Sequence, residues 1–98
     1  MPLFPYKLHQ LLDEVDESDE LKQIVSWLPG GEAFKLYSAD LFEEKVLKTY
    51  FPRQSRVKSF LRQLQYYGFE NFGEGVFSHP KFRRGKSFRS HFVHSKKN

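Results

Sequence analysis

The feature that most constrains this chain is its high content of aromatic side chains in a short sequence without cysteine. The 98 residues include eleven Phe, five Tyr and one Trp. A chain of this length can close one hydrophobic core but has no room for two. Without cysteine, neither disulfide bonds nor cysteine-ligated zinc can supplement that core, so apolar packing must stabilise the fold. We therefore expect one domain over residues 1–98, with a core from about residue 4 to residue 97.

Charge is divided unequally between the two halves of the chain. Residues 1–50 carry five Lys and Arg against ten Asp and Glu, a net charge of −5, and residues 51–98 carry eleven against two, a net charge of +9. This asymmetry predicts that one side of the domain meets a polyanion while the acidic half faces away. Charge alone leaves both nucleic acid and a membrane surface as partners.

The sequence contains no pattern typical of membrane insertion or secretion. No apolar run approaches the roughly 20 residues that a membrane helix needs. The first residues lack the basic segment and long apolar run of a signal peptide. We therefore expect a soluble intracellular domain.

The first half predicts a helix followed by a hairpin. Pro5 lies in the first turn of a helix whose apolar residues recur at helical spacing. The acidic residues 13–20 have no such spacing, and we expect a solvated loop or a frayed helix end there. Strands at residues 24–27 and 33–37 flank a Pro-Gly-Gly turn, which favours an antiparallel hairpin.

The second half predicts two helices and a second hairpin. Ser38 is a candidate N-cap for one helix, which Pro52 ends. The next helix runs from Val57 to Tyr67 and is followed by a C-terminal glycine. Short strands at residues 69–72 and 76–78 flank a Gly-Glu-Gly turn. The basic, aromatic segment 80–98 has weak periodicity, so its packing is not predicted.

This order of elements predicts an α+β fold of the winged helix-turn-helix type. Three helices would pack on a small antiparallel β-sheet, and the last hairpin would be the wing. In the third helix the predicted core-facing stripe is centred on Val57, and polar residues fall on the opposite side. The stripe comprises Val57, Phe60, Leu61 and Leu64, and the opposite face comprises Ser59, Arg62, Gln63 and Tyr66.

The polar face of the third helix has the chemistry of a DNA-reading surface. A major groove admits an α-helix, and an Arg fork can donate two hydrogen bonds to guanine. Arg62 lies centrally on this face, where a base contact would need it. Cations before the helix and in its first turn suit phosphates instead, and Ser59 could join backbone N–H groups in holding one. Those cations are Arg53, Arg56 and Lys58.

Enzymatic and metal-binding functions find little support. His91 and His94 could share a helix face, but no cysteine or nearby carboxylate completes a metal shell. No nucleophile elbow, phosphate loop or dinucleotide fingerprint occurs. We expect no catalytic residue, metal or cofactor.

Other non-enzymatic functions stay open, because a polar face opposite an apolar stripe is typical of almost any surface helix. One is a winged helix that binds DNA or chromatin without sequence preference, and another is a winged helix for protein interaction. A basic module on a membrane surface fits least, because the basic residues are interleaved with aromatic residues.

Several strings resemble the DNA-binding domain of heat-shock transcription factors. The resemblance runs from Phe4 to about Lys97, and its most specific part is the string in the third helix with the Tyr-Gly-Phe that follows. The matching strings are Phe4-Pro5-Tyr6-Lys7-Leu8, Ile24-Val25-Ser26-Trp27, Phe42 with Val46-Leu47 and Tyr50-Phe51, Ser59-Phe60-Leu61-Arg62-Gln63-Leu64, Tyr67-Gly68-Phe69, His79-Pro80 and Phe82-x-Arg84-Gly85.

The resemblance implies a transcription factor that binds double-stranded DNA at inverted nGAAn-type repeats. It assigns guanine reading to Arg62. It also implies a nuclear protein of the stress response, and a homotrimer formed by regions outside this chain. Its backbone contacts fall on Ser59, Gln65 and Tyr67, with Arg53 or Arg56 and Lys96 as the basic counterparts.

The sequence also departs from the family's usual pattern. The segment 51–60 is one residue longer than is usual, and the wing is reduced to a Gly-Glu-Gly turn. Tyr66 stands where the family has Met, so an outward tyrosine could add stacking or a thymine-methyl contact. Glu70 and Asn71 replace a common basic pair, which removes positive charge from the wing.

Overall fold

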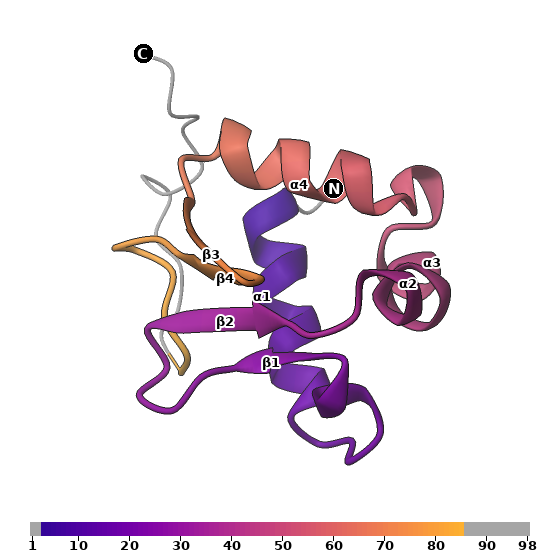
Figure 1. The fold of residues 1–98 in the computed structure, drawn as a ribbon, viewed down its shortest axis with the longest axis horizontal. Coiled ribbons are helices and arrows are strands. Elements are labelled where there is room, and N and C mark those ends of the chain that lie inside the picture. The colour runs from indigo at the N-terminus through magenta and orange to yellow at the C-terminus, as the bar shows by residue number, and fades with distance from the viewer. Residues whose placement is uncertain (1–2, 86–98) are drawn as a thin grey trace.

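The computed structural model describes residues 3–85 and has the predicted α+β architecture. A four-stranded antiparallel sheet lies against helix α1, α4 crosses one end of α1, and the second helical region stands to one side (Figure 1). The strands are β1 (Val25–Trp27), β2 (Ala33–Leu36), β3 (Glu70–Gly73) and β4 (Val76–Ser78), and the helices are α1 (Phe4–Val15), α2 (Ala39–Leu41), α3 (Lys48–Tyr50) and α4 (Val57–Tyr66). Short 3₁₀ turns lie at Leu21–Gln23 and Pro52–Gln54.

The two predicted hairpins join into one sheet in the order β1-β2-β4-β3. In the first hairpin Trp27 pairs with Phe34, and in the central contact Phe34 pairs with Phe77 of β4. All three aromatic side chains are buried in the core. Because β4 pairs with β2, the second hairpin, which is the predicted wing, is part of the main sheet. The wing, defined as residues 70–78, therefore has a position fixed by β2.

The predicted turn of the wing is a two-residue turn that depends on glycine. Glu74 and Gly75 both have positive φ, 55° and 82°, as a type I′ turn requires. The Gly75 carbonyl accepts a hydrogen bond from the Leu36 N–H at 2.8 Å. A Cβ on Gly75 would lie 2.3 Å from the Leu36 carbonyl oxygen, so only glycine fits this close approach.

The second helix is predicted correctly at its ends, but its middle is irregular. Ser38 Oγ accepts the N–H of Leu41 at 3.2 Å, which confirms the predicted N-cap. Phe42–Leu47 then forms a π-helix between α2 and α3. In a regular α-helix Leu47 would point about 140° away from Phe42. The wider π turn lets both side chains reach the core, where each is fully buried.

Tyr50, at the end of α3, connects this region to α1. Its hydroxyl donates a short hydrogen bond to the carboxylate of Glu14. Burial, together with that carboxylate, raises the pKa of Tyr50 to about 12. The same hydrogen bond holds the pKa of Glu14 below its usual range, so the pair is a neutral phenol and a charged carboxylate at neutral pH.

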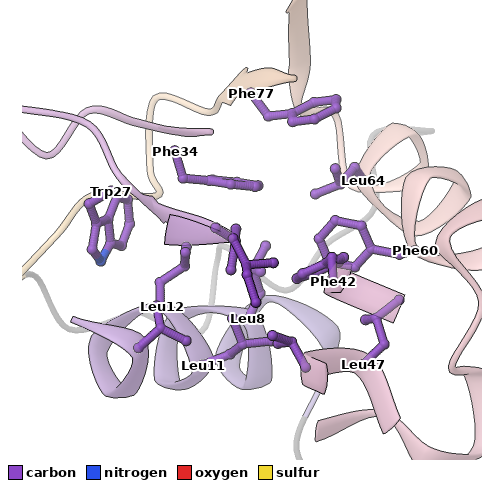
Figure 2. Packing of buried hydrophobic residues seen from close by; sticks show 14 of the residues in the cluster. Leu8, Leu11, Leu12, Trp27, Phe34, Phe42, Leu47, Phe60, Leu64 and Phe77 are labelled. Carbon is purple, nitrogen blue, oxygen red and sulfur yellow. The ribbon is translucent and has the colours of Figure 1, made fainter. Parts of the chain in front are cut away.

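The core is continuous and made of apolar side chains, with aromatic rings at its centre (Figure 2). Phe60 of α4 packs against Phe42 with ring centroids 4.8 Å apart, and it also contacts Phe4 at 5.6 Å. Trp27 is a core residue as predicted, and its indole N–H donates to Asp13 at 3.3 Å. No polar residue of the described part of the chain is buried, so apolar packing stabilises the core.

Replacing Phe60 with alanine tests this packing. Phe60 is 2% exposed, so its removal leaves a cavity between α4, the second helix and the start of α1. We expect a loss of about 3–5 kcal/mol in the free energy of unfolding, measured by urea denaturation. Leu61→Ala is the matched control, because its exposed side chain should cost less than about 1 kcal/mol. Equal losses for the two variants would contradict this packing.

Candidate nucleic-acid interface

Helix α4 presents Arg62 at the centre of its outward face. Phe60 and Leu64 are the buried residues of the helix, at 2% and 1% exposure. At about 100° per residue, the direction opposite their midpoint falls on Arg62. The predicted stripe was therefore wrong in its centre. The sequence predicts Leu61 in this stripe, but its side chain is 39% exposed. The reason is that Phe60, and not Val57, packs against the aromatic rings beneath α4.

The structure divides the predicted recognition residues into an exposed set and a half-buried set. The exposed residues are Arg53, Arg56, Lys58, Arg62, Gln65 and Tyr66. The half-buried residues are Ser59, Gln63 and Tyr67. Gln63, predicted to point outward, lines an open hollow of about 560 Å³ beside Phe51 and Arg53. Within α4, Lys58, Arg62, Gln65 and Tyr66 are therefore the exposed side chains of the outward face, and Arg53 and Arg56 precede the helix.

The N-terminal end of α4 is capped by a residue from another helix. Arg56 occupies the N-cap position but makes no capping hydrogen bond with its side chain. Instead, Oε1 of Glu43 accepts the N–H of Val57 at 3.1 Å. Oε2 of Glu43 lies 3.8 Å from Nη1 of Arg56. This role was not predicted from the sequence, because Glu43 is separated from Val57 by 14 positions and no local capping pattern connects them.

The C-terminal end of α4 closes with the predicted glycine. Gly68 has a φ of 85°, and the N–H of Phe69 donates to the Leu64 carbonyl at 2.9 Å. The N–H of Gly68 donates to the Gln65 carbonyl at 3.0 Å, which completes a Schellman motif. This motif ends the helix and turns the chain directly into the wing.

His79 lies at this junction, directly after β4. Its Nδ1 accepts the N–H of Lys81 at 3.0 Å, and its ring lies 5.2 Å from that of Phe69. Burial lowers the pKa of His79, and the nearby Lys81 charge lowers it further, against a hydrogen bond with the backbone of Tyr67 that raises it. The neutral imidazole therefore links the end of the wing to the end of α4.

Two of the basic residues beyond the wing face the acidic half of the chain. Arg83 lies 3.1 Å from Glu32, and Arg84 lies 2.5 Å from Asp16. The N–H of Arg84 also donates to the Gly31 carbonyl at 2.9 Å. The expectation that the positive half forms one polyanion-facing side is therefore wrong for these two residues. Phe82 explains their position, because its ring is buried against Trp27 and draws this segment to the first hairpin.

Neither a metal site nor a membrane span is found among residues 3–85. No group of three or more His, Asp or Glu side chains in this part of the chain could hold a metal ion. No helix in it is long and apolar enough to cross a membrane. The predicted contact Lys96 and the pair His91 and His94 lie outside the described residues.

Comparisons with known proteins agree on one family. The profile of the HSF-type DNA-binding family matches residues 4–96. Heat shock factor protein 2 of Gallus gallus is 29% identical over 99 residues, which cover 88% of this chain and 17% of that protein. This chain thus spans less than a fifth of the length of that relative. Because this is a family of DNA-binding domains, the match agrees with the expected non-enzymatic function.

The solved structures that match also include complexes with DNA. Skn7 of Chaetomium thermophilum with HSE DNA is 28% identical with a TM-score of 0.68, covering 92% of this chain and 93% of that one. The same protein with SSRE DNA is 31% identical with a TM-score of 0.66, covering 82% of this chain and 85% of that one. The predicted winged helix-turn-helix architecture is thereby confirmed.

The lowered pKa of His79 makes stability depend on pH. A histidine whose pKa is lower in the folded state binds fewer protons there, so its contribution is present above about pH 6.5 and is lost as the pH falls below it. We expect the free energy of unfolding to fall between about pH 7 and about pH 5. His79→Gln should reduce that fall, as measured by urea denaturation at each pH. An identical pH dependence in the variant would contradict this role.

Proposed function

We propose that this chain, which belongs to the HSF-type DNA-binding family, binds double-stranded DNA sequence-specifically with α4 in the major groove. Arg62 donates to guanine in inverted nGAAn-type repeats. The observation that carries this proposal is the position of Arg62 at the centre of the outward face of α4, opposite the buried Phe60 and Leu64.

Arg62 has the properties that a base-reading residue needs. Its side chain is exposed, and no acidic side chain within residues 3–85 forms an ion pair with it. The guanidinium is therefore available to donate two hydrogen bonds to O6 and N7 of guanine. Tyr66 lies one turn further along the same face and is 54% exposed, so it suits contact with a thymine methyl group or stacking.

The surrounding residues suit the phosphate backbone. Arg53 and Lys58 are exposed on either side of the start of α4, where a helix lying in the groove meets its rim. Ser59 in the first turn of α4 and Tyr67 at its end are half-buried and can each place a hydroxyl group against a phosphate, and Gln65 adds an exposed amide. These contacts would supply affinity that depends on salt and not on sequence.

The structural relatives support DNA as the partner. Skn7 of Chaetomium thermophilum has been solved with both HSE DNA and SSRE DNA, and both structures match this fold. In the proposed pose the acidic residues 13–20, at and after the C-terminal end of α1, and the first hairpin face away from DNA. The pairing of Arg83 and Arg84 with acidic residues is consistent with that orientation, because it holds those two cations on the far side.

The parent protein would act in transcription regulation. Membership of the family supports a nuclear transcription factor of the stress response. Trimerisation would depend on regions outside this chain, because its residues contain no sustained heptad pattern.

Arg62→Ala tests the proposal by comparing duplexes with inverted GAA repeats and scrambled duplexes. The wild type should prefer the repeats, and the variant should lose about 1–3 kcal/mol of that preference per guanine contact. Its melting temperature should not change, because the side chain of Arg62 is exposed and points away from the core. Dissociation constants for both duplexes, measured by fluorescence anisotropy at fixed salt, give the result.

Arg83→Ala is the matched control for lost positive charge. It removes the same charge beside Glu32, away from α4, and should leave the preference for GAA repeats unchanged. If Arg62→Ala keeps the full preference, Arg62 does not read the base. If the wild type binds both duplexes equally, the chain is a winged helix without sequence preference. If it binds neither while folded, a protein-interaction function replaces the proposal.

A further inference from the structure

One carboxylate of the second helix contacts both the first backbone N–H of α4 and the cation that precedes this helix. Glu43 accepts the backbone N–H of Val57 with one oxygen, 3.1 Å away, and places the other 3.8 Å from the guanidinium of Arg56. The side chain of Glu43 is 33% exposed, whereas that of Arg56 is 80% exposed. The carboxylate is thus held close to the protein, while Arg56 extends from it into solvent.

The hydrogen bond to Val57 satisfies one of the N–H groups that a helix start leaves unpaired. Arg56 at the N-cap position provides no such acceptor. A negative group also interacts favourably with the positive end of the helix dipole. Since Glu43 belongs to the π-helical segment, this bond fixes the start of α4 relative to the second helix.

The contact with Arg56 has a different consequence. Arg56 lies directly before α4, and a cation at the start of a groove-bound helix suits a phosphate contact. Glu43 offsets part of this positive charge, and its own negative charge repels the DNA backbone. An exposed ion pair at this separation is weak, so it adds little to stability. Its effect on a polyanion is larger, because every phosphate contact adds to salt-dependent affinity.

We propose that Glu43 is a positioning residue for DNA binding, which anchors the start of α4 and restrains Arg56 from the phosphate backbone. This inference rests on the proposed function, because it places DNA phosphates beside Arg56. The two residues near α4 then have separate effects. Arg62 determines the preference between sequences, and Glu43 limits the affinity for all sequences.

Glu43→Gln separates the two contacts of Glu43. The amide oxygen can still accept the N–H of Val57, but the negative charge is gone. We expect several-fold tighter binding to GAA and scrambled duplexes alike, with their affinity ratio unchanged within about twofold. If Arg56 gains one phosphate, the slope of log affinity against log salt should steepen by about 0.9. Anisotropy titrations at several salt concentrations measure both quantities.

Glu44→Gln is the matched control, because Glu44 is exposed and adjacent and its loss changes the net charge equally. It should leave the slope unchanged. The gain from Glu43→Gln should fall by at least about half in an Arg56→Gln background. Glu43→Ala, which also removes the acceptor, should melt at a lower temperature than Glu43→Gln. That comparison tests the anchoring without DNA.

The outcomes distinguish this inference from the proposed function. An unchanged slope in Glu43→Gln, in a wild type that binds DNA, overturns the restraint of Arg56 and leaves the proposed function standing. The restraint is likewise overturned if Glu44→Gln gives the same gain. Equal melting temperatures for Glu43→Ala and Glu43→Gln overturn the anchoring. A folded wild type that binds no duplex overturns the proposed function, and the restraint of Arg56 with it.

Discussion

The packing of Phe60 determines how α4 faces its surroundings. Its ring lies between Phe42, 4.8 Å away, and Phe4, 5.6 Å away, and contacts Phe51 at 6.5 Å. Three rings from different segments therefore hold one side chain of the helix, and rotation of α4 would break all three contacts. With Phe60 and Leu64 held against the core, Arg62 points directly away from it. The proposed base contact thus depends on a buried phenylalanine two positions earlier.

The two ends of α4 are fixed by different means. Glu43 of the second helix accepts the first N–H, and the Schellman motif around Gly68 closes the last turn. Beyond that motif, pairing of β4 with β2 fixes the wing, and Phe82 draws Arg83 and Arg84 to the acidic side. The separation of charge is therefore less complete in space than along the sequence, because Arg83 and Arg84 of the positive half lie against acidic residues of the first half. Within residues 3–85, those two cations are committed to the far side, while the exposed Arg53, Lys58 and Arg62 lie around α4.

Local patterns in the sequence predicted the elements, and the structure added what depends on contacts between them. Ser38, Gly68 and the wing turn were predictable because each acts within a few residues. The π-helix was not, because it arises from the need to bury both Phe42 and Leu47. The predicted centre of the buried stripe of α4 is wrong for a similar reason. Several apolar residues are compatible with more than one rotation of the helix about its axis, and the rings that contact Phe60 determine which one occurs. The capping of α4 by Glu43 could not be predicted from the sequence, because only the tertiary structure brings Glu43 to Val57.

In the proposed mechanism, α4 reads DNA sequence through an orientation that the core sets. A binding selection from a pool of random duplexes tests this mechanism directly, because the selected sequences reveal whether any base is read. We predict enrichment of inverted nGAAn-type repeats by the wild-type chain. Recovery of no common sequence, or of one without GAA, would contradict the mechanism.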